Sequence, residues 1–203
     1  MQGFDEGVFG GHFHTANAPP VFGIPGLDVL AFSNGADWVR GMRTALRTAK
    51  RGGVSMLLDS TALLNRKHLQ RGDGAWQFAY PAPSELLLHD DVIVYEHGAA
   101  PADARTVRAS ADADAGATSV GGSGGGDARG VVVVTYGNGV PKALEAQRAS
   151  GEAFDVIDCP LLSRPPRALF DALRGHYTSL LLVDPCRPGA GPLAHFVPPL
   201  QVC

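Results

Sequence analysis

The sequence lacks the features of several protein classes. Only three cysteines are present, and they are far apart, without a CxxC pair or a Cys/His zinc spacing: Cys159, Cys186 and Cys203. This favours reduced thiols over disulfides or structural zinc. No apolar run reaches the roughly 18 residues of a membrane-spanning helix, and the first residues have neither the basic nor the apolar region of a secretory signal. With a net charge of −3, the chain lacks the positive charge that attracts nucleic acid or an anionic membrane. We expect a soluble, intracellular protein that binds neither nucleic acid nor a membrane. It would be cytoplasmic in a bacterium and would lie in the mitochondrial matrix of a eukaryote.

Large apolar residues are almost missing from residues 99–130, where two valines are the only sizeable ones. Such a glycine-rich, polar stretch cannot offset the entropy of ordering its backbone. We therefore expect a low-complexity linker there, between an N-terminal part over residues 1–98 and a C-terminal part over residues 131–203.

The N-terminal part shows a strand, helix, strand pattern. Asn34, with Asp37 three residues later, predicts a capped helix over residues 36–50 whose apolar side chains share one face. The segment VSMLLD is nearly all apolar, which favours burial on both faces of a parallel sheet. The pattern indicates a βαβ unit. The expected strands are Leu27–Phe32, Val54–Asp59 and Val92–Tyr95.

The C-terminal part alternates strands and helices, which is typical of a doubly wound parallel sheet. The expected strands are Val131–Tyr136, Phe154–Asp158 and Ser179–Asp184, and the expected helices are Pro141–Ala149 and Pro166–Arg174. Both parts together predict an α/β protein with two partial three-layer parallel-sheet domains.

The sharpest polar feature is the GHFHT loop, which holds His12 and His14. Alternate residues of an extended segment point the same way, so the two imidazoles could share a face. Three roles are open: a structural loop histidine, a metal ligand, or a catalytic or cofactor-facing group. A metal would need a third ligand, and no nearby Asp, Glu, Cys or His has convincing spacing, so we assign no metal site.

Two segments follow strands at the sheet edge where ligands of open α/β proteins bind. Gly137-Asn138-Gly139 is not a GxGxxG motif, and a tight turn explains it better than a phosphate site. Asp184-Pro185-Cys186-Arg187 offers an arginine for a phosphate or carboxylate, whereas Cys186 has no base nearby to make it a nucleophile.

The order of these segments resembles thiamine diphosphate-dependent 2-oxoacid dehydrogenases, specifically the decarboxylating component. The run GGHFHTANAPPVFGIPGLDVLAFSNGADWVRGMRTALRTAK resembles the His loop, strand and helix of the pyrimidine domain. The run DGAWQFAYPAPSELLLHDDVIVY is similar to the exit from that domain in fused, single-chain forms. The runs VVVVTYGNGVPKALEAQRA, FDVIDCPLLSRPPRALFDAL and LLLVDPCRPG resemble the transketolase C-terminal domain. Residues 1–98 would then be a partial pyrimidine-binding domain and residues 131–203 a partial C-terminal domain, apparently truncated at both ends.

The resemblance implies decarboxylation of a 2-oxoacid, of the branched-chain or pyruvate type, and acyl transfer to lipoamide. It implies thiamine diphosphate with Mg²⁺ as cofactor. The implied partners are a complementing alpha-type or second dehydrogenase chain and the lipoyl domain of the acyltransferase. His14 matches the loop histidine that faces the cofactor and helps proton transfer to the lipoyl group, a role that suits imidazole.

The sequence departs from the family pattern, and two alternatives to the dehydrogenase interpretation stay open. The cofactor glutamate and the magnesium-binding domain have no counterpart here, and Pro185 stands where glutamate is usual, so the chain alone should be inactive. One alternative is a non-catalytic, degenerate paralogue that acts in assembly; the other is a transketolase-like fragment acting on sugar phosphates.

Overall fold

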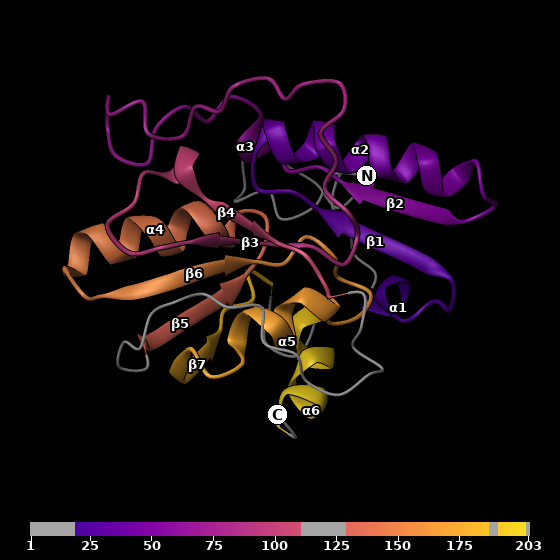
Figure 1. Cartoon of the computed structure of the whole chain (residues 1–203). Coiled ribbons are helices and arrows are strands. Elements are labelled where there is room, and N and C mark those ends of the chain that lie inside the picture. Colours follow the sequence, from indigo (N-terminus) through magenta and orange to yellow (C-terminus); the bar gives the residue numbers. More distant parts are fainter. Residues whose placement is uncertain (1–18, 111–128, 187–190, 202–203) are drawn as a thin grey trace.

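The structure is a computed structural model that describes residues 19–110, 129–186 and 191–201. It contains a two-stranded parallel sheet, β1-β2, and a five-stranded sheet in the order β4-β3-β6-β5-β7. Figure 1 shows α2 alongside the two-stranded sheet, and α4 and α5 on opposite sides of the larger one. No helix in the described residues is long and apolar enough to span a membrane.

The N-terminal elements form the expected βαβ unit, in which β1 and β2 pair in parallel from Leu27↔Val54 to Ala31↔Leu58. β2 is nonetheless an edge strand whose residues are exposed or half-buried except Leu58, so the expectation of burial on both faces is wrong. Among the described residues only β1 pairs with it, so this sheet has two strands there. The elements are α1 (Pro19–Phe22), β1 (Leu27–Ala31), α2 (Gly35–Ala49), β2 (Val54–Leu58) and α3 (Thr61–Leu64).

The C-terminal alternation is confirmed, because β6 and β7 both pair in parallel with β5. Alternate residues of β5 face opposite sides of the sheet: Val133 packs with α4, whereas Val132 and Val134 pack with α5 and η2. The elements are β5 (Arg129–Thr135), α4 (Gly139–Ser150), β6 (Phe154–Asp158), α5 (Arg167–Leu173), β7 (Tyr177–Leu182), η2 (Pro192–Phe196) and α6 (Val197–Leu200).

Two further strands make the larger sheet mixed instead of purely parallel. β3 (Val92–Tyr95), expected with the N-terminal part, pairs antiparallel with β6. Residues 99–110, expected in the linker, include η1 (Pro101–Asp103) and β4 (Arg105–Val107), which pairs antiparallel with β3. All of β3 is buried, so it needs a sheet that is covered on both faces. The connection from β3 to β4 is too short for a parallel crossover, which makes that pair antiparallel. Of the rest of the expected linker, residues 129 and 130 begin β5, and residues 111–128 lie outside the described residues.

The two sheets are joined by main-chain hydrogen bonds along β1. Ala31 N donates to Pro160 O (2.9 Å), and Leu162 N donates to Val29 O (2.8 Å). These bonds flank an antiparallel bridge between Leu30 and Leu161. They bring the carboxyl ends of β1 and β6 together, and this junction positions the candidate site.

Candidate functional site

Buried polar side chains meet where β1 and β6 end. Asp158, the last residue of β6, is fully buried, and one of its carboxylate oxygens, Oδ2, accepts a hydrogen bond from Ser33 Oγ (2.5 Å). Its other oxygen, Oδ1, has no hydrogen-bond partner among the described residues. Burial raises the pKa of Asp158 well above its ordinary value, and the nearby Asp37 carboxylate adds to the rise. This carboxyl group therefore favours the neutral, protonated form.

The N-cap of α2 extends this network. Asn34 Oδ1 accepts from the Asp37 backbone N–H (2.9 Å), which confirms the predicted cap. The Asn34 amide also donates to Asp37 Oδ2 (2.6 Å) and to the Tyr95 hydroxyl (3.3 Å). Asp37 is in turn paired with Arg40. The cap thus connects the N-terminal helix to β3 of the larger sheet.

A second polar group lies at the carboxyl ends of β5 and β7, around Asp184. Its Oδ1 accepts from the Tyr136 hydroxyl (2.7 Å) and from Cys186 N (3.1 Å), and its Oδ2 accepts from Leu193 N (3.0 Å). Gly191 is required beside it, because a Cβ there would come 1.8 Å from Asp184 Oδ2. Asp184 therefore holds the chain after β7 in place.

The thiol of Cys186 is unsuited to nucleophilic attack. Burial raises its pKa to about 11, so the reactive thiolate is scarce at neutral pH. The thiol lies 3.4 Å from the Tyr136 hydroxyl, and burial raises the pKa of that phenol as well. Neither group can serve as a base for the other.

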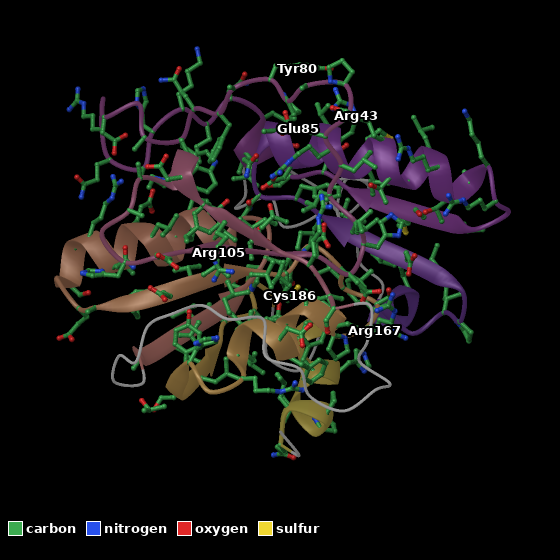
Figure 2. All side chains as sticks on the ribbon, in the orientation of Figure 1. Arg43, Tyr80, Glu85, Arg105, Arg167 and Cys186 are labelled. Carbon is green, nitrogen blue, oxygen red and sulfur yellow. The ribbon has the colours of Figure 1, made fainter. Side chains whose placement is uncertain are left out.

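Above the first turn of α2 lies a hollow of about 400 Å³. Arg43 holds one wall by donating to the carbonyl oxygens of Pro81 (3.2 Å) and Glu85 (3.1 Å), and its guanidinium lies 5.8 Å from the centre of the Tyr80 ring. Figure 2 shows Arg43 and Glu85 close to Tyr80, over α2. The walls come from residues 34–36, 63–67 and 76–81.

The predicted site residues are only partly within the described chain. His12, His14 and Arg187 lie outside the described residues. Gly137-Asn138-Gly139 forms the expected tight turn, with Gly137 at φ +51°, and α4 starts at Gly139, earlier than expected.

Sequence reasoning missed the buried pair of Ser33 and Asp158. The available signal was an aspartate closing the otherwise apolar end of the FDVID strand, at the edge where ligands bind in such sheets. Within the described residues, no group of three or more His, Cys, Asp or Glu side chains could hold a metal ion. These residues alone do not fit a magnesium diphosphate group.

Comparisons with known proteins bear on the fold. No protein-family model matches the chain, and no curated protein matches it. Among solved structures, the chain is similar to one titled "Split gene transketolase, inactive beta4 tetramer". The TM-score is 0.55 at 15% sequence identity, over 93% of this chain and 49% of that one. The chain thus spans about half of that neighbour's length, and the likeness shows a transketolase-like α/β fold.

Proposed function

We propose that this chain is part of a thiamine diphosphate-dependent 2-oxoacid dehydrogenase, in which it supplies a partial pyrimidine-side domain and a partial C-terminal domain. The observation that carries the proposal is the order of the family-like segments within a chain of transketolase-like fold. The proposed division keeps the boundaries at residues 98 and 131, although β3 of the first part and β4 of the linker pair within the sheet of the C-terminal part.

The proposed enzyme needs a second chain. The cofactor, when bound, would stabilise the negative charge that decarboxylation leaves on the substrate. Because the described residues do not fit magnesium diphosphate, an alpha-type or second dehydrogenase chain would hold that end of the cofactor. The neighbour's title, an inactive tetramer of beta chains, supports inactivity of this chain alone.

His14 is the proposed catalytic residue of this chain. It would move a proton while the acyl group passes to a lipoyl domain, a role that suits imidazole near neutral pH. Whether the substrate is pyruvate or a branched-chain 2-oxoacid would depend on the chain that completes the site.

Titration calorimetry with thiamine diphosphate and Mg²⁺ tests the proposal. We expect no binding to this chain alone, and binding together with 2-oxoacid decarboxylation once an alpha-type dehydrogenase chain is added. In that mixture His14→Ala should slow acylation of a lipoyl domain more than decarboxylation. His195→Ala, an exposed histidine of η2, should leave both rates unchanged. Absence of cofactor binding in every mixture would refute the enzyme proposal.

One observation favours the non-catalytic alternative. The described carboxylates at the sheet edge serve structural contacts: Asp184 holds the chain after β7, and Asp158 is buried against Ser33. A paralogue used for assembly would still associate with the alpha-type chain, but without cofactor binding.

The neighbour's name favours a transketolase-type activity instead. Turnover of sugar phosphates but not of 2-oxoacids would identify that activity.

A further inference from the structure

The strand β7 presents an open edge on the larger sheet. It pairs with β5 on one side, and no strand in the described part of the chain pairs with its other side. Residues 178–181 are exposed, including Leu180 at 39% and Leu181 at 53%. These two leucines point to opposite faces of the sheet, so both faces of β7 are open at residues 178–181, whereas Tyr177 and Leu182 pack against the core.

The hydrogen bonds to β5 identify which peptide groups are on the open side. Val183 N donates to Val134 O (2.9 Å), so the main chain of Val183 faces β5. Because this direction alternates along a strand, Leu181 and Ser179 also face β5. The peptide groups of Thr178, Leu180 and Leu182 therefore face outward, where they can bond to another strand.

Residues 177–183, YTSLLLV, carry none of the devices that protect exposed edges. They contain no charged residue and no proline, whereas natural edge strands usually carry lysine, proline or a bulge. Val131 on the neighbouring strand, 41% exposed, is in register with Ser179 and so extends the apolar surface on the face of Leu181. An uncharged, apolar edge of this kind favours pairing with a strand of similar character.

We propose that β7 pairs antiparallel with β7 of a second copy of this chain, joining the two sheets across a two-fold axis. The charges at its ends argue for this partner and direction. The N-terminal end carries the exposed basic residues Arg174 and His176, and the C-terminal end carries the half-buried Asp184, whose carboxylate also accepts the hydrogen bonds described above. Antiparallel pairing puts the basic end of one copy beside the acidic end of the other, whereas parallel pairing would put like charges together.

The outward peptide groups fix the register. Hydrogen-bonded positions must be outward-facing in both copies, so Leu180 lies opposite Leu180 of the second copy and Thr178 lies opposite Leu182. His176 then lies opposite Asp184. Between these positions, Ser179 of each copy meets Leu181 of the other as a non-hydrogen-bonded pair, the closer of the two kinds of pair.

Sedimentation equilibrium on the chain alone tests the pairing. We expect twice the 21.2 kDa mass of one chain. Leu181→Lys places a charge on the pairing surface without removing a bond to β5, and it should reduce the mass to that of one chain. Leu64→Lys, at a leucine 69% exposed on α3, is the matched control and should stay dimeric. A monomeric wild type, or a dimeric L181K, overturns the proposal.

Cysteine pairs test the register. Ser179→Cys mixed with Leu181→Cys should form a disulfide-linked dimer, because non-hydrogen-bonded pairs lie within disulfide reach. Ser179→Cys alone should not, because two copies of residue 179 are only diagonal neighbours, and the parent chain controls for its own thiols. Equal cross-linking with Ser179→Cys alone would overturn the proposed register. The chain is assayed without cofactor, so these results are independent of the proposed enzyme chemistry.

Discussion

The buried carboxyl group of Asp158 should make the free energy of unfolding fall as pH rises. Burial raises the pKa of Asp158 in the folded state, so between the unfolded and folded pKa values the native state holds a proton that the unfolded chain has released. The stabilising contribution is complete below the unfolded pKa of about 3.9. It is lost as pH rises through the folded pKa. Asp158→Asn removes the titrating group and should remove this dependence.

The expected size follows from proton linkage. Each pH unit between the two pKa values removes about 1.4 kcal/mol of stability from the wild type but not from Asp158→Asn. For a chain of 203 residues, each such step shifts Tm by roughly 3–6 °C. The asparagine amide has nearly the same shape, and its carbonyl oxygen can still accept from Ser33 Oγ.

Urea unfolding at a series of pH values from mildly acidic to neutral measures the effect, with Trp38 and Trp76 as fluorescent probes. The free energy of Asp158→Asn minus that of the wild type should increase with pH. Asp103→Asn, at an exposed aspartate of η1, is the control and should run parallel to the wild type. The reasoning fails if Asp158→Asn also runs parallel to the wild type over this range.

Two further predictions concern packing and the hollow. Gly139→Ala should lower the free energy of unfolding by about 1–3 kcal/mol, because the new Cβ would come 2.0 Å from Thr135 Oγ1; Gly35→Ala, with no atom within 4 Å, should not. Equal stability of the two variants in chemical denaturation would contradict this. Arg43→Ala should make residues 81–85 cleave faster in limited proteolysis, because it removes three hydrogen bonds to carbonyls there. Arg47→Ala, exposed on the same helix, should cleave at the wild-type rate.

The local elements could be predicted from the sequence because their signals are local. The cap of α2 follows from Asn34 and Asp37, three residues apart, and the alternation after residue 130 follows from apolar runs separated by turns. The structure confirms these elements, with ends that differ by one or two residues at most positions. The fold class follows from the same pattern, since alternating strands and helices favour parallel sheets.

Pairing over long distances could not be predicted in this way. Val92–Tyr95 is a clear apolar strand, but the sequence does not say which sheet it joins, and chain order suggested the wrong one. Ser33 and Asp158 are 125 residues apart, so neither marks the other as a partner. His14 stays a prediction, because it lies outside the described residues.

The position of β3 has a consequence for how the polypeptide can be divided. It belongs to the first half of the chain, yet it lies between β4 and β6 in a sheet whose strands β5, β6 and β7 follow residue 128. A backbone cut between residues 111 and 128 would separate β6 from β3, its partner on one side. Neither piece should then behave as an autonomous folding unit, and the two should recover native structure only by fragment complementation.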